Sequence, residues 1–113
     1  MDDNCIFCRI SRGEVPSTFL YQDEEVFVIR DIQPRAPTHV LIIPRTHIPA
    51  VSEVGPEQAA LVGKLVLIAN RLAAQEGVAQ SGYRLVINCG PDAGQGVAHL
   101  HLHLLGGRRL GMM

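Results

Sequence analysis

Near its C-terminus the chain alternates histidine with leucine, reading HLHLHLL from His99 to Leu105 just before two glycines. Because successive side chains of a β-strand point to opposite faces, the pattern predicts a strand with three imidazoles on one face and leucines on the other. The leucine face predicts a core. The histidine face predicts chemistry, since histidine serves as nucleophile, acid, base or metal ligand near neutral pH. The alternative is a solvated polar face that carries histidines without a function.

Other apolar runs extend this strand into a small sheet. Residues 18–21 and Val26–Arg30 are rich in β-forming side chains, flank a polar turn and predict a hairpin. Residues 40–43 end at Pro44 and predict a strand buried on both faces. Residues 83–88 predict a further strand, so the sheet should have about five.

One long helix is predicted over residues 56–76, with Pro56 in its first turn and Gly77 as its cap. A short helix is expected at residues 8–12. Strands and helices do not alternate as βαβ units, so we predict an α+β fold with a mostly antiparallel sheet. The long helix has two apolar rows, of which the first should pack on the core and the second should form a dimer face: Leu61, Leu65, Ile68 and Leu72, then Val62, Val66, Ala69 and Ala73.

The length and charge of the chain limit its organisation and its partners. With 113 residues it should form a single domain over residues 1–113. A formal net charge of −1 gives no basic field, so no nucleic-acid partner is expected. We found no signal sequence and no apolar run of membrane-spanning length, and we expect a cytoplasmic protein without a membrane partner. Three cysteines do not suggest a disulfide framework and favour a reducing compartment.

A glycine-rich loop, NCGPDAGQGV at residues 88–97, directly precedes the histidine strand. Its three glycines allow the backbone to approach a ligand and to turn N–H groups toward phosphate oxygens. Gly-Pro-Asp is also an ordinary turn, but the adjacent histidines favour a phosphate site. His39, just before residues 40–43, is either a further functional imidazole or a solvated residue at a strand start.

These residues together suggest a reaction at phosphorus. A neutral imidazole can attack phosphorus, and water can then hydrolyse the phosphohistidine-type intermediate while N–H groups hold the phosphate charge. His101 is the candidate nucleophile because it has a possible partner on either side, in His99 and His103. We therefore take His39, His99, His101 and His103 as the candidate catalytic residues, with His103 and His39 as donors or proton carriers. Asn88 is a candidate ligand of a phosphate or leaving-group oxygen.

The histidine segment matches the His-φ-His-φ-His-φ-φ signature of the histidine triad family, and the chain resembles its nucleotide-binding branch of purine nucleoside phosphoramidases. The resemblance covers essentially the whole chain, through CIFCRI, GEVP, DIQPRAPTH, IPRTHI and the stretch from Gly94-Gln95-Gly96 to Gly106-Gly107-Arg108, in the family's order. It implies hydrolysis of purine nucleotide conjugates such as AMP joined to an amine or to lysine, through a nucleotidyl-His101 intermediate. It also implies a homodimer that pairs long helices and sheet edges.

By position, the resemblance places Asp31 and Ile32 near the ribose and base. It places the phosphate among Asn88, Gly94, Gln95, Gly96, His101 and His103. The chain departs from the pattern at Gly96, where many relatives carry serine, and at Ala98, where an aromatic residue is common. It also ends at Met113, without the aromatic-containing tail of several relatives. These departures bear on rate and on specificity for the leaving group.

Cys5 and Cys8 form a C-x-x-C pair. Similar family members use this pair with the counterparts of His47 and His99 to bind zinc. Cys₂His₂ is a closed tetrahedral set, so such a zinc would be structural, and no cofactor would be needed for catalysis. The alternative is two reduced cysteines without a metal.

Two other function classes are open at this point. One is a sibling enzyme, a dinucleoside polyphosphate hydrolase or nucleotidyl transferase. The other is a non-catalytic regulator that binds a nucleotide or zinc. A catalytic metal on the three histidines is a further possibility, against which the loop glycines argue, since a metal hydrolase has less need of a backbone cradle.

Overall fold

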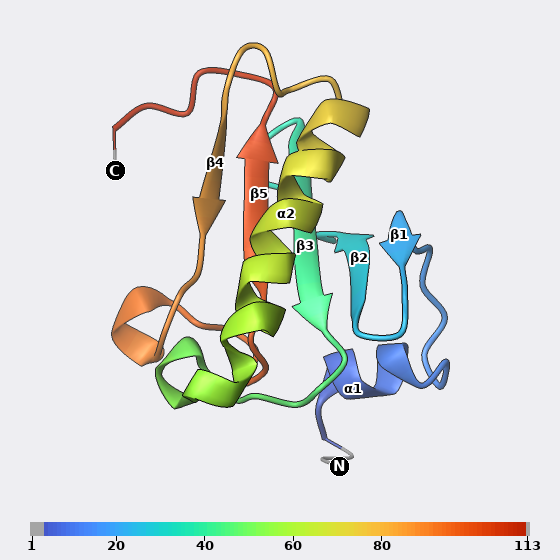
Figure 1. Cartoon of the computed structure of the whole chain (residues 1–113). Helices are drawn as coiled ribbons and strands as arrows, with labels where there is room; N and C mark the ends of the chain where they lie inside the picture. The colour runs from blue at the N-terminus through green and yellow to red at the C-terminus, as the bar shows by residue number, and fades with distance from the viewer. Residues whose placement is uncertain (1–3, 113) are drawn as a thin grey trace.

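The computed structural model describes residues 4–112, and Figure 1 shows a single sheet with a long helix across one face. Helix α1 spans Ile6–Ser11 and helix α2 spans Ala59–Gln75. The strands are β1 (Tyr21–Gln22), β2 (Val26–Arg30), β3 (Thr38–Pro44), β4 (Tyr83–Val86) and β5 (Leu102–Gly106). Their order in the sheet is β1-β2-β3-β5-β4, and every neighbouring pair is antiparallel. The α+β prediction is confirmed.

Helix α2 covers one face of the sheet and forms the larger core with it. Leu65, Ile68 and Leu72 of the helix are buried against a layer of strand residues that includes Ile42 and Leu104. The helix is preceded by a 3₁₀ turn at Pro56–Gln58 rather than beginning at Pro56. After Gly77, the Val78 N–H donates to the Ala73 carbonyl and closes the helix as expected. The two predicted rows do not stay separate, because Ala69 and Ala73 are buried in this core while Val66 is exposed.

On the opposite face of the sheet, α1 and the segment after it cover one end. Phe7 and Ile10 of α1 pack there with Phe27, Leu41 and Ile43, in a second and smaller core. Strand β3 is buried along its whole length because it lies between the two cores, as predicted. The alternation of β3 places His39 on the same face as Leu41, beyond the edge of α1. The rest of this face is left open for a site.

Several predicted bounds differ from the structure. Helix α1 begins and ends earlier than residues 8–12, residues 18–20 precede the short β1, and β4 ends at Val86 rather than at 88. Strand β5 starts at Leu102, so His99 and His101 precede the strand that was expected to hold all three histidines. The ladder with β3 pairs Ile42 with Leu102. It stops there because Pro44 has no N–H to donate, and the Leu100 N–H bonds to the Ile48 carbonyl instead.

Within residues 4–112, no helix is long and apolar enough to cross a membrane.

Candidate active site and metal-binding cluster

The open part of the sheet forms the floor of a cavity of about 710 Å³. His39 of β3, His103 of β5 and His101 just before β5 all line it. Alternation within β4 and the residues after it places Val86 and Asn88 on the same face, and both line the cavity too. Phe7 of α1 closes one end of the cavity. The structure thus gathers three of the four predicted catalytic histidines around one space.

His101 has a fixed tautomer. Its Nδ1 lies 2.7 Å from the backbone carbonyl oxygen of His99, and a carbonyl oxygen only accepts hydrogen bonds. We therefore assign the proton to Nδ1, which leaves the lone pair on Nε2. The ring is held on one side by the edge of Phe7, at a centroid distance of 5.2 Å, and is buried except toward the cavity. In this tautomer Nε2 is the nucleophilic nitrogen of the ring.

His39 and His103 form a directed pair. The Arg35 backbone N–H donates to His39 Nδ1 over 3.1 Å, so the proton of His39 belongs on Nε2. That Nε2 lies 2.9 Å from His103 Nδ1 and 3.4 Å from an Asp31 carboxylate oxygen. His103 accepts at Nδ1 and carries its own proton on Nε2. The pair ends in a proton donor on the His103 ring, and Asp31 lies close enough to stabilise a positive charge on His39.

Burial keeps this pair of imidazoles neutral. It lowers the pKa of His103 to about 4, with further lowering by the neighbouring His101 and His39. It also lowers the pKa of His39, and the charge of Asp31 only partly opposes that effect. Both rings are neutral at pH 7, which is the state that the assigned hydrogen bonds require.

The glycine-rich loop presents unused donors to the cavity. Gly94 is in the left-handed region at φ 79°, which favours glycine there. Gly96 and Val97 line the cavity, and their backbone N–H groups have no partner in the described part of the chain. Asn88 also lines the cavity, and its side-chain amide has no hydrogen-bond partner among residues 4–112. The N–H groups of these residues can donate hydrogen bonds to a bound anion.

The structure does not place every predicted ligand in the cavity. The Gln95 side chain accepts from the Gly90 N–H and donates to the carbonyls of Pro49 and Val97, so it holds the loop in shape. Ile32 stands at the cavity's rim and is 94% exposed. Asp31 and Gly94 do line the cavity.

Sequence reasoning missed two groups that act through the backbone, the N–H of Arg35 and the N–H of Val97. No residue type signals such a donor. It also missed Arg84, which lines the cavity two residues before Val86. The period of two along residues 84, 86 and 88 was a signal that could have found it.

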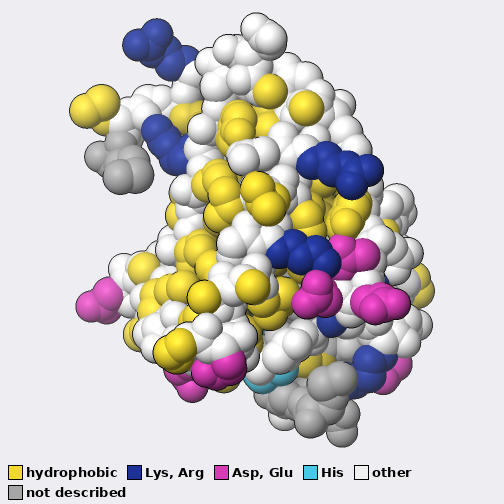
Figure 2. All heavy atoms as spheres, viewed as in Figure 1, with side chains coloured by type: hydrophobic (Ala, Val, Ile, Leu, Met, Phe, Trp, Pro, Cys, Tyr) yellow, Lys and Arg dark blue, Asp and Glu magenta, His cyan; other side chains and the backbone are white. Residues whose placement is uncertain are grey.

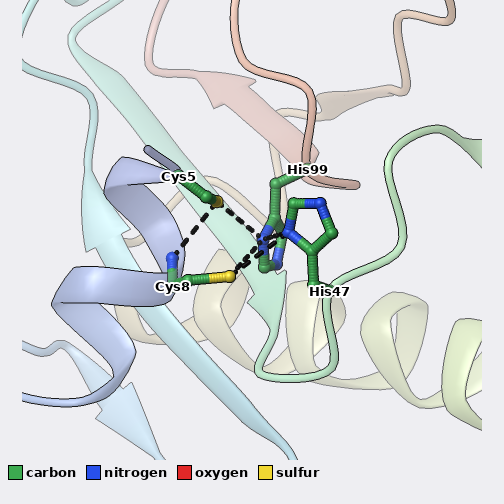
Figure 3. Close-up of side chains that lie close together, drawn as sticks. All are labelled: Cys5, Cys8, His47 and His99. Carbon is green, nitrogen blue, oxygen red and sulfur yellow. Dashed lines mark hydrogen bonds between the residues drawn. The ribbon is translucent and has the colours of Figure 1, made fainter. Parts of the chain in front are cut away.

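His99 lies apart from the cavity, in a buried cluster with Cys5, Cys8 and His47 (Figure 3). Cys5 Sγ lies 3.2 Å from His99 Nδ1, and Cys8 Sγ lies 3.2 Å from His47 Nδ1. The two Nδ1 atoms are 3.1 Å apart, and all four ligand-type atoms lie within 4.8 Å of one another. The expected row of three imidazoles is therefore divided, because the chain before Leu102 leaves the strand and turns His99 toward α1.

The cluster fits a tetrahedral zinc ion. Zinc bonds of 2.0–2.3 Å to nitrogen and sulfur give ligand-to-ligand separations of roughly 3.3–3.8 Å, close to those observed. His99 Nε2 lies 2.7 Å from the Pro44 carbonyl, so its proton is on Nε2 and its Nδ1 lone pair faces the cluster. The Cys8 N–H donates to Cys5 Sγ and orients that sulfur. Four donors close the set, so a metal held here has no open position for a substrate.

A second group of possible ligands, Asp31, His39 and His103, lies inside the cavity. A metal at this group would need the lone pair of His39 Nε2. The Arg35 N–H already requires the lone pair on Nδ1 of the same ring, so metal binding would break that hydrogen bond. The arrangement fits a proton relay better than a metal site.

A model of one protein family, the HIT domain, matches residues 12–110 of the chain. The chain belongs to the HIT domain family. Purine nucleoside phosphoramidase of Escherichia coli (strain K12) is 49% identical over 113 residues, which are 100% of this chain and 95% of that protein. The 14 kDa zinc-binding protein of Zea mays is 44% identical and covers 96% of this chain and 86% of its own length.

Solved structures agree with the family assignment. A HIT family hydrolase from Clostridium thermocellum superposes with a TM-score of 0.96 at 49% identity, covering 100% of this chain and 98% of that one. A histidine triad protein from Clostridium difficile gives a TM-score of 0.95 at 37% identity, with the same coverage. The histidine triad resemblance drawn from the sequence is confirmed.

Proposed function

We propose that this HIT protein is a purine nucleoside phosphoramidase, a hydrolase that cleaves the P–N bond of AMP joined to an amine. The observation that carries the proposal is the fixed tautomer of His101, whose free Nε2 lone pair shares a cavity with the unpaired N–H groups of Gly96 and Val97. A nucleophile and an anion cradle in one space are what attack at phosphorus requires. The full-length similarity to the Escherichia coli enzyme supports the substrate class.

The first step is attack of His101 Nε2 on phosphorus. Asn88 and the loop N–H groups hold the phosphate oxygens, and the P–N bond breaks as the new N–P bond forms. The leaving amine takes the proton from His103 Nε2, which leaves a negative charge on the hydrogen-bonded pair of His103 and His39. The imidazolium that forms at His101, whose Nδ1 keeps its proton, balances this charge. The Asp31 carboxylate is placed to bind the ribose.

The second step is attack of water on the nucleotidyl-His101 intermediate. The histidine pair, now lacking one proton, accepts it from the water, and the P–Nε2 bond breaks to release AMP. His101 Nδ1 stays bonded to the His99 carbonyl throughout, which holds the ring in line. Two displacements at phosphorus return the original configuration.

The decisive experiment compares AMP–amine conjugates with diadenosine polyphosphates as substrates, with and without a strong chelator. A phosphoramidase hydrolyses the conjugates faster, and its initial rate does not depend on free metal. Faster cleavage of the polyphosphates would assign the chain to the sibling class of hydrolases or transferases. AMP binding without any turnover would leave the non-catalytic regulator as the remaining function class.

A structural zinc at Cys5, Cys8, His47 and His99 is part of the proposal, and the name of the Zea mays relative supports it. When bound, it would tie α1 to the sheet and supply folding free energy. It would have no contact with substrate. We propose a cytoplasmic location, in keeping with the two reduced thiols of this cluster.

We also propose a homodimer, formed through the outer face of α2. Exposed small and apolar residues recur there at helical spacing: Ala59, Gly63, Val66, Leu67 and Ala74. Figure 2, which views the molecule from the side of α2, shows hydrophobic side chains gathered on this face. Leu67 is 69% exposed and Val66 40%. Large apolar side chains exposed together on one helix face are typical of an interaction surface.

Sedimentation tests the dimer. The wild type should show the mass of two chains at micromolar concentration, and Val66→Glu should show one chain. Gln80→Glu adds the same charge at an exposed position outside α2 and should leave the dimer intact. A wild-type mass of one chain would exclude the homodimer.

A further inference from the structure

Positive charge gathers beside the candidate active site. A second cavity, of about 420 Å³, lies between β4 and the C-terminal segment, and Arg84 lines both cavities. The described residues that line the two cavities include five of the chain's ten cationic residues but a single carboxylate, Asp31; the five are Arg30, Arg35, Arg84, Arg108 and Arg109. Arg30 is ion-paired with Glu76, so the excess positive charge comes from the other four. The chain as a whole has a formal charge of −1, so this concentration is local.

Arg84 lies next to the histidine that protonates the leaving group. In the sheet, Val86 of β4 pairs with His103 of β5, and Arg84 pairs with Leu105. Arg84 and His103 are therefore diagonal neighbours on the cavity face, with Cα atoms roughly 7–8 Å apart. An arginine side chain can span that distance.

The guanidinium of Arg84 has N–H groups that are available to a ligand. One nitrogen, Nη2, donates to the Gly111 carbonyl of the C-terminal segment. Its other N–H groups have no partner among residues 4–112. Arg108 bonds the carbonyls of Arg109 and Arg35, which holds the segment against the sheet beside Arg84. A fork of unused N–H donors in a positively charged recess matches a carboxylate or phosphate.

The substrate's own phosphate does not need these arginines, because Asn88 and the loop N–H groups serve it at the other end of β4. We propose that Arg84, with Arg108 and Arg109, selects substrates whose leaving group carries an anion. The anion is either the carboxylate of an amino acid joined to AMP through its nitrogen, or a phosphate on the amine. The inference rests on the proposed phosphoramidase function and names the leaving group that this site accepts.

The test uses pairs of substrates that differ only in the anion. AMP joined to tryptophan is compared with AMP joined to tryptamine, and AMP joined to phosphoethanolamine with AMP joined to ethanolamine. The wild type should prefer the anionic member of at least one pair by about tenfold in kcat/KM, and that pair identifies the carboxylate or the phosphate as the anion. Arg84→Gln should abolish the preference, because kcat/KM for the anionic member falls about tenfold further than kcat/KM for the neutral member. Arg84→Glu should reverse it, and Arg84→Lys should keep most of it.

Arg71→Gln is the matched control, because Arg71 lies on α2, on the other face of the sheet, over the ring of Tyr21. It should leave both preferences unchanged. Equal losses for anionic and neutral substrates in Arg84→Gln would overturn the inference and leave the phosphoramidase function standing. Turnover of none of the four by the wild type would overturn the proposed function instead. In that case, binding affinities of the same four conjugates for the wild type and for Arg84→Gln would test the inference. If the wild type binds the anionic and the neutral member of each pair equally well, the role of Arg84 is overturned.

Discussion

The histidine-rich segment contributes residues to two regions of this molecule. The regions differ in whether their polar atoms have partners within the chain. In the cluster of Cys5, Cys8, His47 and His99, every ligand-type atom has another within about 3 to 4 Å, and the cluster is closed. In the cavity, His101 Nε2 and the Gly96 and Val97 N–H groups have no partner within the described chain. Gly96 is exposed, so water can occupy such groups until a ligand replaces it. The closed cluster can therefore stabilise the fold, whereas the open cavity can bind a ligand.

The two regions also touch. The His99 carbonyl accepts a hydrogen bond from His101 Nδ1–H, and the Phe7 ring contacts both imidazoles, with centroid distances of 5.8 Å to His99 and 5.2 Å to His101. The backbone carbonyl of a cluster residue therefore orients the His101 ring. Substitutions on each side of this contact should separate stability from chemistry.

The largest effect is expected at His101. His101→Ala and His101→Asn should reduce hydrolysis of an AMP–amine conjugate to background, because the only route through a covalent intermediate is lost. Both should still bind AMP, since the loop and Asp31 are intact. With the wild type, rapid quench and mass spectrometry should find AMP on the peptide of residues 98–105, and the configuration at phosphorus should be retained.

Inversion at phosphorus would contradict this mechanism and indicate direct attack by water. Near-normal activity of His101→Ala would do the same. His47→Ala is the control on the other side of the contact, because it removes an imidazole from the cluster alone. The folded fraction of His47→Ala should hydrolyse the AMP–amine conjugate at a rate close to that of the wild type.

The second effect is expected at the cluster and falls on stability. Protein purified without added metal should carry about one zinc per chain by elemental analysis. Structural zinc sites contribute about 10–16 kcal/mol of apparent binding free energy at neutral pH, so Cys5→Ser with Cys8→Ser should lower the free energy of unfolding by several kcal/mol. Turnover of the folded variant should change less than about threefold, because a closed site does not contact substrate.

Cys89→Ser provides the control for this prediction. Cys89 is exposed and lies outside the cluster, so its loss should change neither zinc content nor stability. Denaturant unfolding of the two variants measures the difference. Wild-type protein without zinc, or anomalous density among His39, His101 and His103, would refute the zinc assignment.

How the histidine segment divides could not be predicted from its spacing. Alternation correctly indicated that the leucines face a core, and Leu102 and Leu104 do. It placed His99 with His101 and His103 because it assumed one strand throughout. The strand begins only at Leu102, and the cause lies 58 residues earlier in the chain, at Pro44, whose missing N–H ends the ladder. A break that depends on the neighbouring strand is invisible to local periodicity.

The same limit applies to the rest of the candidate site. The sequence indicated the helix, the buried β3 and the glycine-rich loop, since each depends on local pattern or backbone freedom. It gave no sign of the Arg35 N–H that sets the tautomer of His39, because any residue supplies an N–H. It also did not reveal that Gln95 would hold the loop rather than face the cavity. Contacts between distant segments decide such roles.

The third effect is expected at the proton relay. His103→Ala and His39→Ala should each lower turnover about 10²–10³-fold, the usual loss for one supporting donor in an active site. His103 should be the more severe of the two, because it gives the proton to the leaving group directly. A conjugate with a leaving group that needs no proton should restore most of the activity of His103→Ala but none of the activity of His101→Ala. Equal rescue of both variants would contradict the assigned roles.

The smallest effect is expected at Gly96, on the open side. Its φ is not in the left-handed region, and a Cβ built there meets no atom within 4 Å, so serine fits without strain. A hydroxyl beside the phosphate adds a hydrogen bond to a charged group, worth about 1.5–3 kcal/mol, of which only a part acts in the transition state.

Gly96→Ser should therefore raise kcat/KM for an AMP–amine conjugate by up to about tenfold, while Gly96→Ala, which adds the Cβ alone, should change it little. Gly94→Ser, at φ 79°, should lower it because the backbone there favours glycine. If Gly96→Ser and Gly96→Ala both lose activity, the position requires open space rather than a donor, and the phosphate is held by the loop N–H groups alone.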